Sequence, residues 1–241
     1  MHIPRIYHNG PITSGQTLQL APAASHHLTT VLRLKPDAQV IVFNGQEGEY
    51  DSTIQKIHKL SVSLEIKQFH ARQTQSPLNL HLAQAIGKPS KMDFVIQKAT
   101  ELGVTTITPV IGAHSSIKLT HQQLNKKQQH WLDIVINACE QCGRTILPSL
   151  QPSVPLTTWL TQVNATTKLI LTPDSDNKLR KLPQQQHVAL LIGPEGGFSE
   201  AELQLAALHQ FQPISLGPRI LRTETAAIAT LAILQALSGD L

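Results

Sequence analysis

Two loops near the C-terminal end carry the residue types best suited to hold a small ligand. The first lies in LLIGPEGGFSEAEL, from Leu190 to Leu203, and the second lies in LGPRILRTETAAIATLAIL, from Leu216 to Leu234. Each leads from an apolar, strand-like segment through a loop with glycine and proline into a predicted helix. Loops at the carboxyl ends of strands are where open α/β sheets bind ligands. We therefore expect the two loops to close around one small molecule.

The first loop narrows the kind of ligand. Its glycines, Gly193, Gly196 and Gly197, permit backbone conformations that other residues avoid and let a ligand approach closely, Gly196 above all if its φ is positive. No Lys-Ser/Thr pair follows them, so this is not a Walker phosphate loop, and the spacing is not the dinucleotide pattern GxGxxG either. A loop containing Glu195 suits a neutral or cationic ligand better than a pyrophosphate. A simple strand-to-helix turn is the alternative interpretation.

Both loops carry signals for the start of a helix. Ser199, with Glu202 three residues later, predicts a capping box. In the second loop, Thr223 is expected to cap the helix that follows, so that the side chain of Arg222 projects into the pocket. Arg219 and Glu224 bring further charge to this loop.

The elements that must position these loops follow from residue 78 onward, where strands and helices alternate as in a parallel sheet. The predicted strands are Leu78–Ala85, Thr106–Val110, Lys168–Thr172, Val188–Ile192 and Pro213–Leu216. One predicted helix buries the face from Met92 to Leu102 and stops at Gly103, and a longer one runs roughly from His121 to Cys142. The last, Thr225–Leu237, is apolar nearly all round and should be buried on more than one side.

The first 70 residues are β-rich and indicate a separate small barrel. Val40–Phe43 ends in Asn44-Gly45, which is a strong hairpin signal, and two alternating strands follow. These strands are Tyr50–Lys56 and Ser61–Gln68, and a short helix is expected over His26–Leu34. The polar stretch from His70 to Pro77 predicts a linker, which gives domains of 1–72 and 73–241.

Composition bounds the class of protein. Of the 241 residues, 41% are hydrophobic, which favours a sizeable buried core over disorder. A net charge of +4 favours a polyanionic partner without requiring one, and 4% aromatic residues argue against a broad base-stacking platform. Cys139 and Cys142 are the two cysteines, so a disulfide framework is excluded and a reducing cytoplasm is expected. A single CxxC pair lacks the further ligands of a structural zinc site, so no metal is expected.

The two C-terminal loops resemble the cofactor-binding loops of the SPOUT methyltransferases, most closely those of the RsmE family. Three further segments match that family: Pro4-Arg5-Ile6-Tyr7 with the later His26-His27 and Val31-Leu32-Arg33; GKPSKMDFVIQKATELG from Gly87 to Gly103; and Cys139-Glu140-Gln141-Cys142-Gly143-Arg144. Cys142 departs from the usual Glu-Gln-x-Gly-Arg pattern at a position that tolerates small residues. The resemblance thus covers nearly the whole chain.

The resemblance implies a PUA-like N-terminal barrel and a C-terminal parallel α/β domain whose chain is knotted around S-adenosylmethionine. It implies methylation of N3 of one uridine in the 16S ribosomal RNA of the 30S subunit by a homodimer. The implied cofactor-binding residues are Leu171, Thr172, Ile192, Gly193, Pro194, Glu195, Gly196, Gly197, Leu216, Gly217, Ile220, Leu221, Thr225 and Ala226. The implied RNA contacts are Arg5, His26, Arg33, Lys88, Lys91 and Arg219. Arg222, Glu140 and Arg144 are the implied catalytic residues.

Each segment also has a simpler explanation. Arg5 and Arg33 are equally well explained as ordinary solvated side chains. Glu140 and Arg144 have the spacing of a modest salt bridge on a helix surface. For the whole chain, the alternatives are an RNA-binding protein that no longer methylates and a SPOUT enzyme that acts on another RNA site.

Overall fold

The computed structural model describes residues 3–46, 48–58, 61–115, 120–179 and 183–241. The chain forms two compact units. Unit 1 comprises Met1–Gln75 together with Cys139–Leu147, and unit 2 comprises Ser76–Ala138 together with Pro148–Leu241. Unit 1 is therefore built from two stretches of sequence.

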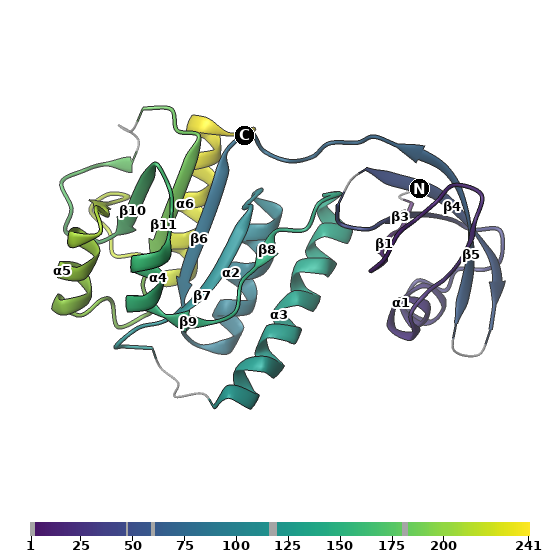
Figure 1. Ribbon diagram of the computed structural model, residues 1–241, viewed down its shortest axis with the longest axis horizontal. Helices are drawn as coiled ribbons and strands as arrows, with labels where there is room; N and C mark the ends of the chain where they lie inside the picture. The colour runs from purple at the N-terminus through teal and green to yellow at the C-terminus, as the bar shows by residue number, and fades with distance from the viewer. Residues whose placement is uncertain (1–2, 47, 59–60, 116–119, 180–182) are drawn as a thin grey trace. The chain divides into compact units, whose positions relative to one another are not determined.

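Unit 1 contains a five-stranded sheet in the order β1-β3-β4-β5-β2 (Figure 1). Its strands are β1 (Arg5–Tyr7), β2 (Thr17–Gln19), β3 (Gln39–Phe43), β4 (Glu49–Ile57) and β5 (Val62–His70). β1 pairs with β3 in parallel, and the remaining pairs are antiparallel. The alternating apolar residues of these strands form one buried core that includes Ile6, Val42, Ile54 and Leu64. The strands predicted from alternation are confirmed, whereas the three-residue strands β1 and β2 were too short to predict.

The connection between β3 and β4 differs from the predicted two-residue hairpin turn. Asn44 and Gly45 lie in a longer loop, because β4 begins only at Glu49. The Asn44 side chain accepts a hydrogen bond from the backbone N–H of Gln46, which is a local turn that asparagine favours. Gly45 has a φ of +78° and forms a parallel β-bridge with Ile146, so this loop also pairs with the second stretch of unit 1.

The helix predicted over 26–34 begins earlier and ends differently. It consists of α1 (Pro22–His26), where proline at the first position favours helical φ, and a π-helical turn η1 (His27–Val31). The turn ends where Arg33 adopts a left-handed φ of +54°, and the backbone N–H of Leu34 bonds to the carbonyl of Leu28. This geometry closes a helix C-terminus and is usually taken by glycine.

Unit 2 contains a seven-stranded parallel sheet, as the alternation of strands and helices predicted. Its path runs β12-β10-β11-β6-β7-β8, and β9 also pairs with β7. The strands are β6 (Asn79–Ala85), β7 (Thr106–Ile111), β8 (Ser149–Leu150), β9 (Val154–Pro155), β10 (Thr167–Leu171), β11 (His187–Ile192) and β12 (Gln212–Ile214).

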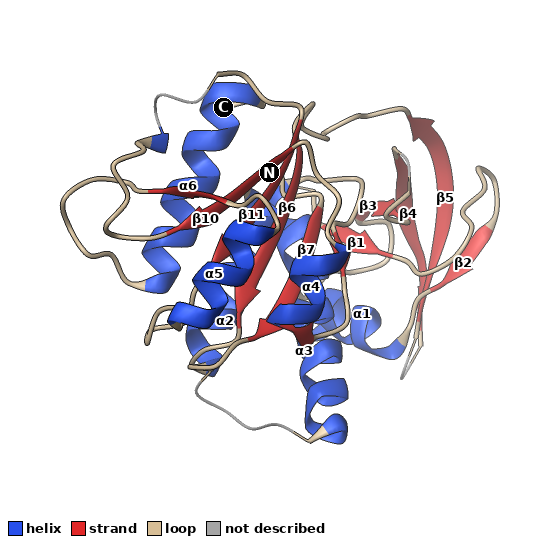
Figure 2. Ribbon diagram, turned by 60° about the vertical axis from the view of Figure 1, so that its left-hand side comes forward, coloured by secondary structure: helices blue, strands red, loops and turns tan. Residues whose placement is uncertain are grey.

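Helices cover both faces of this sheet (Figure 2). α2 (Pro89–Glu101) packs against α6 (Thr223–Ser238), while α4 (Leu156–Gln162) and α5 (Glu200–Leu208) cover the opposite face with Trp159 and Ala206 in the core. The long helix α3 (His121–Cys142) has the bounds that the sequence predicted. The short α4 was not predicted. Within the described part of the chain, no helix is long and apolar enough to cross a membrane.

The strand order places the two motif-bearing loops together. β10 lies between β11 and β12, and both pairings are parallel. The carboxyl ends of all three strands therefore meet at one edge, where the loops after Leu171, Ile192 and Ile214 begin. This edge is the place where an open parallel sheet binds its ligand.

Candidate cofactor pocket and RNA-facing residues

A cavity of about 620 Å³ opens at this edge of unit 2. Its volume lies within the usual range for small-molecule sites. Of the residues expected to bind a cofactor, twelve line it: Leu171, Thr172, Ile192, Gly193, Pro194, Glu195, Gly197, Leu216, Gly217, Ile220, Leu221 and Ala226. Gly196 and Thr225 are not among its lining residues. Arg222, Arg219, Lys88 and Lys91 line it as well.

Several lining residues were missed in the sequence. They are Pro173, Asp174, Phe198, Leu203 and Thr223. Pro173 and Asp174 follow β10, and the loop after this strand carries no glycine motif. Only the pairing of β10 with β11 indicates that these two residues lie near the first loop. Phe198 packs beneath the first loop, where its ring lies 3.1 Å from the position that a Cβ on Gly193 would take.

The first loop is held by the predicted capping box. Ser199 accepts from the backbone N–H of Glu202, and the Glu202 carboxylate accepts from the backbone N–H of Ser199. The other carboxylate oxygen of Glu202 accepts from the backbone N–H of Ala113 at 2.7 Å. One buried glutamate thus fixes both the start of α5 and the loop that follows β7.

Positive φ in this pocket belongs to glycines other than Gly196. Gly197 has a φ of +69° and Gly217 a φ of +136°, and a Cβ on either would meet no neighbouring atom within 4 Å. A Cβ on Gly196 would lie 3.1 Å from the Cβ of His114, and Gly196 does not have a positive φ. The expectation of a special backbone conformation at Gly196 is therefore corrected in favour of Gly197 and Gly217.

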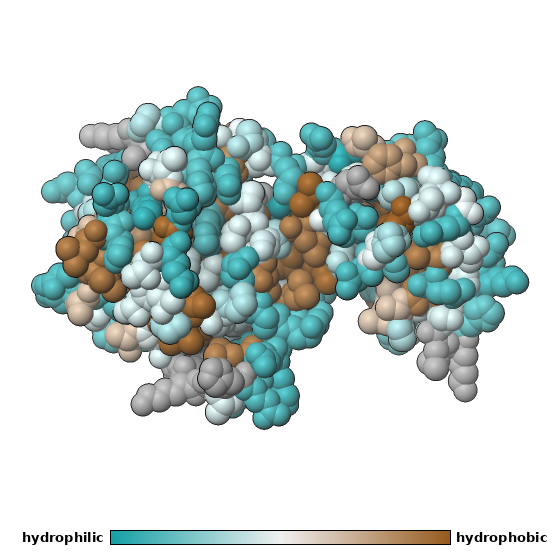
Figure 3. Space-filling model, viewed as in Figure 1, coloured by the Kyte–Doolittle hydropathy of each residue, from teal (hydrophilic) through white to brown (hydrophobic). Residues whose placement is uncertain are grey.

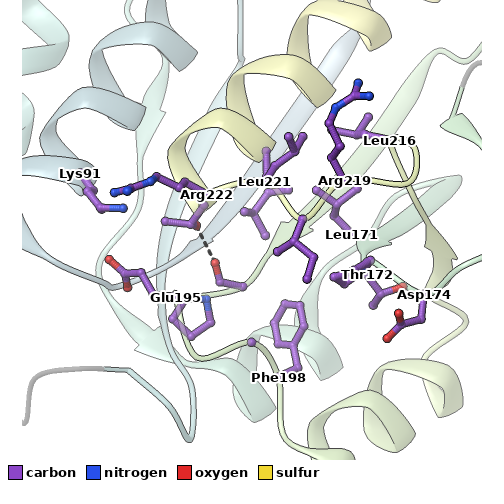
Figure 4. Close-up of a pocket in the computed structure, with 18 of the residues that line it drawn as sticks. Lys91, Leu171, Thr172, Asp174, Glu195, Phe198, Leu216, Arg219, Leu221 and Arg222 are labelled. Carbon is purple, nitrogen blue, oxygen red and sulfur yellow. Dashed lines mark hydrogen bonds between the residues drawn. The ribbon is translucent and has the colours of Figure 1, made fainter.

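Thr223 does not cap α6 as predicted. Arg222 occupies the N-cap position without a side-chain cap, and Thr223 is the first helical residue. The Thr223 hydroxyl instead donates to the carbonyl oxygen of Gly193 at 2.7 Å, which is the dashed line in Figure 4. The second loop is thereby tied to the first.

Charged side chains lie at both ends of the pocket. In Figure 4, Arg222, Lys91 and Glu195 lie at one end, while Asp174 and Arg219 lie at the other. Lys91 donates to Glu224 at 2.9 Å, with 18% of each side chain exposed. Partial burial raises the pKa of Glu224, but the hydrogen bond and charge of Lys91, together with the charge of Arg222, outweigh it and leave that pKa below its ordinary value.

Glu195 contacts the start of α2. One of its carboxylate oxygens accepts from the backbone N–H of Lys88 at 3.4 Å, and its carboxylate lies over Gly87, where a Cβ would come within 2.6 Å. A carboxylate at a helix N-terminus is stabilised by the helix dipole. Gly87 therefore leaves the space that this contact between the first loop and α2 requires.

Arg5 is not a solvated phosphate contact. Its side chain is 3% exposed and forms a buried ion pair with Glu49, with a further hydrogen bond to the carbonyl of Arg144 at 3.1 Å. The guanidinium also lies over the ring of Phe43. A guanidinium buried in this way is structural, so the expectation that Arg5 binds RNA phosphate is corrected.

Glu140 and Arg144 lie in unit 1 and do not line the pocket of unit 2. Glu140 accepts from the backbone N–H of Tyr7 at 2.9 Å, and the buried Arg144 donates to Gln75 at 2.7 Å. Burial raises the pKa of the Glu140 carboxyl, although the Tyr7 N–H and the charge of Arg5 oppose this. Their neighbour Cys139 is buried as well, which raises its pKa to about 12.

His26 and Arg33 are exposed on unit 1, close together in the chain at η1. Val31 and Leu32, between them, are also exposed, at 59% and 38%. The structure thus brings Lys88, Lys91, Arg219 and Arg222 to one pocket, and places His26 and Arg33 on a different unit.

Comparison with known proteins agrees with this arrangement. A family model described as an RNA methyltransferase domain matches residues 74–235, and one described as an RNA methyltransferase PUA domain matches residues 20–67. These matches define the class, which is an RNA methyltransferase that carries a PUA domain.

The relatives identify the family. The ribosomal RNA small subunit methyltransferase E of Buchnera aphidicola (Schizaphis graminum strain) is 38% identical, over 99% of this chain and 98% of its own. A Neisseria gonorrhoeae enzyme of the same name, crystallised with S-adenosylmethionine, is 35% identical with a TM-score of 0.92 and full coverage of both chains. A Legionella pneumophila methyltransferase structure with bound S-adenosylmethionine is 44% identical, with a TM-score of 0.98 and full coverage of both chains. The chain belongs to the ribosomal RNA small subunit methyltransferase E (RsmE) family of SPOUT enzymes.

Substitution of Glu140 by glutamine is expected to stabilise the protein at neutral pH. Because folding raises the pKa of Glu140, the folded state holds its proton more tightly than the unfolded state, so stability is lost as the pH rises through that pKa. Glutamine is uncharged and can still accept from the Tyr7 N–H. In urea denaturation, the free energy of unfolding should fall less between about pH 4 and pH 7 for Glu140→Gln than for wild type. The control, Glu49→Gln, breaks the buried pair with Arg5, and its free energy of unfolding should fall roughly 3 kcal/mol below that of wild type. A free energy of unfolding that falls equally far below wild type in Glu140→Gln would refute this role of Glu140.

Substitution of Gly217 by alanine is expected to weaken ligand binding at the pocket. The added methyl meets no atom of the protein, so its effect comes from the positive φ, which alanine adopts only with strain. We expect the Kd for S-adenosylmethionine to rise by about tenfold, the equivalent of 1.4 kcal/mol, in calorimetry. Gly15→Ala, at a φ of +86° in unit 1 and also without a close contact, is the matched control and should leave this Kd unchanged.

Proposed function

We propose that this protein uses S-adenosylmethionine to methylate N3 of one uridine, uracil 1498, in the 16S ribosomal RNA of the small subunit. The observation that carries the proposal is the pocket formed where β10, β11 and β12 end. It coincides with the motifs of a family whose solved members, named above, hold S-adenosylmethionine. We further propose that the enzyme acts in the cytoplasm, and that its chain is knotted at this pocket as in other SPOUT proteins.

The pocket fits S-adenosylmethionine. Apolar side chains such as Leu171, Ile192 and Leu221 line the cavity and offer surface for the adenosine. Glu195 and Asp174 are the acidic side chains among its lining residues, which suits a ligand with a sulfonium and an ammonium. The bound cofactor supplies an electrophilic methyl group, and its transfer requires neither a metal nor a covalent enzyme intermediate.

The chain's own residues must position the uridine and stabilise its charge. Uridine N3 holds a proton at neutral pH, so the site has to favour the anion that attacks the methyl group. Arg222 is exposed at the pocket, where a guanidinium facing the uracil oxygens lowers the pKa of N3. Glu140 is proposed as proton acceptor or as the group that orients Arg144. The target base must leave its stack to reach the pocket.

RNA binding is proposed to rest on exposed cations. Lys88 and Arg219 are exposed at the pocket, and His26 and Arg33 are exposed on unit 1, which contains the PUA match. Lys91 is ion-paired with Glu224, so its contribution to phosphate binding is smaller than its sequence position implied. We propose 1–72 as the PUA-like domain along the chain and 73–241 as the methyltransferase domain, with 139–147 packed into unit 1.

We also propose a homodimer. α6 is apolar along its length, and several of its side chains, Ile228 and Ile233 among them, stay half-buried. Apolar side chains also gather over α5 in Figure 3, and the exposed residues of this helix include Leu203 and Leu208. Such surfaces are commonly covered in symmetric dimers. Sedimentation at micromolar concentration tests this state.

The experiment that tests the function is methyl transfer to undermethylated small subunits. Tritium from labelled S-adenosylmethionine should enter 16S RNA of 30S particles from a strain that lacks the protein, and mapping should place it at one uridine N3. Naked 16S RNA should be a poorer substrate. Absence of transfer with intact cofactor binding would favour a non-catalytic RNA-binding protein, and transfer at another site would retain the enzyme class with a different target.

Replacement of Arg222 by alanine is expected to lower the rate of methyl transfer by about a hundredfold or more, the scale of losing one electrostatic stabiliser. The Kd for S-adenosylmethionine should change much less, because the guanidinium serves the uridine. Lysine keeps the charge without the planar fork and should rescue only in part. Arg219→Ala, at the opposite end of the pocket, is the control and should weaken RNA binding more than kcat. A wild-type kcat for Arg222→Ala would remove it from the catalytic site.

Replacement of Arg33 by glycine is expected to affect stability and RNA binding in opposite directions. Glycine relieves the left-handed strain, so the free energy of unfolding should stay the same or rise by about 1 kcal/mol. Loss of a phosphate contact should weaken binding to 30S particles. It should also reduce the slope of log K against log salt concentration by about one. Asp37→Gly, at a φ of +70°, is the matched control because it relieves similar strain without removing a cation. Equal RNA affinities in the two variants would rule out a phosphate contact at Arg33.

A further inference from the structure

A polar side chain lies buried in the central strand of the parallel sheet. β6 is flanked by β11 and β7, and its other buried residues are apolar, as is usual for a strand covered on both faces. Gln84 is the exception, with only 1% of its surface exposed. It stands beside Ile192, the last residue of β11, directly before the first pocket loop.

The amide of Gln84 reaches the second pocket loop. Its Nε2 donates to the hydroxyl oxygen of Thr223 at 3.1 Å and to the carbonyl of Ala85 at 3.2 Å. The Thr223 hydroxyl donates in turn to the carbonyl of Gly193 at 2.7 Å. A continuous chain of hydrogen bonds therefore runs from the sheet, through the start of α6, to the start of the first loop.

The other end of the same amide is not satisfied. Among the residues that the structure describes, the Oε1 atom of Gln84 is buried without a hydrogen-bond partner. A buried acceptor without a partner destabilises a fold, and an apolar side chain of similar length would avoid that cost. Stability alone therefore gives little reason for an amide at this position.

We infer that Gln84 and Thr223 are positioning residues, which fix the distance between the two cofactor loops before the cofactor binds. Gly193 lines the pocket, and Thr223 directly follows Arg222. The chain of hydrogen bonds therefore fixes the backbone of the first loop at Gly193 and the backbone from which the Arg222 side chain extends. Loops fixed in advance lose less conformational freedom on binding, which increases affinity. The inference rests on the proposed function only for the identity of the ligand, since the link between the loops is present in the free protein.

The test compares matched pairs of substitutions in the full chain. Thr223→Val removes the hydroxyl that joins the loops, whereas Thr230→Val removes a hydroxyl that bonds within α6 to the carbonyl of Ala226. Gln84→Met replaces the buried amide at the pocket. Gln235→Met replaces a second buried amide, which bonds Ser76 and Leu102 elsewhere in unit 2. Thr223→Ser keeps the hydroxyl and is the conservative rescue.

Two readouts separate positioning from structure. Hydrogen exchange of the backbone amides at 195–199, measured without cofactor, should accelerate in Thr223→Val and Gln84→Met and stay at the wild-type rate in the two controls. Calorimetry should show the Kd for S-adenosylmethionine rising by about tenfold or more in the same two variants, with near wild-type affinity in Thr223→Ser. The melting temperature of Gln84→Met should equal or exceed that of wild type, while Gln235→Met should melt lower.

Unchanged exchange and unchanged Kd in Thr223→Val and Gln84→Met would overturn the inference. The inference would also fail if Gln235→Met raised the Kd as much as Thr223→Val and Gln84→Met do, in proportion to its lower melting temperature. That pattern would show a purely structural role. If wild type itself binds no S-adenosylmethionine, the proposed function fails, and the exchange data still decide whether the hydrogen bonds hold the loops together.

Discussion

The parallel pairing of β10 with both β11 and β12 is the constraint on which the site depends. It brings three strand ends to one edge, so that the loops after Leu171 and Ile214, whose starts are 43 residues apart in sequence, begin side by side. Parallel strands require long crossovers, and here α5 supplies the crossover from β11 to β12. Its own start is fixed by Glu202, so the capping of one helix also shapes the pocket.

Polar contacts connect the elements that this sheet leaves apart. Thr223 joins the two loops, Glu195 contacts the start of α2, and Lys91 holds the first turn of α6 through Glu224. Each bond joins residues from different elements, and each lies at or beside the pocket. The apolar core of the sheet supplies the stability, while these polar contacts decide where the pocket residues point.

The sequence predicted the features that arise from local patterns. The parallel sheet, the bounds of α3 and the capping box at Ser199 follow from periodicity and from spacings of three to four residues, because those interactions are local. The role of Thr223 was missed, because its hydroxyl donates to a carbonyl thirty residues away and does not cap its own helix. Arg5 was expected to contact RNA phosphate, and its buried ion pair was missed for the same reason, because its partner Glu49 is separated from it by forty-four residues. Motifs revealed which loops matter, but long-range hydrogen bonds determined how each side chain is used.

Unit 1 is completed by a segment that the ribosome delivers late. Residues 139–147 belong to it, and within them Thr145 is fully buried and bonds to Thr74 and to the carbonyl of Arg72. The buried Arg5 contacts the carbonyl of Arg144, a residue 139 positions further along the chain. The first 75 residues therefore emerge during synthesis without the last part of their core, and they must wait until more than half of the polypeptide has been made. The N-terminal unit begins first but cannot finish folding first, which links its maturation to the growth of the methyltransferase domain.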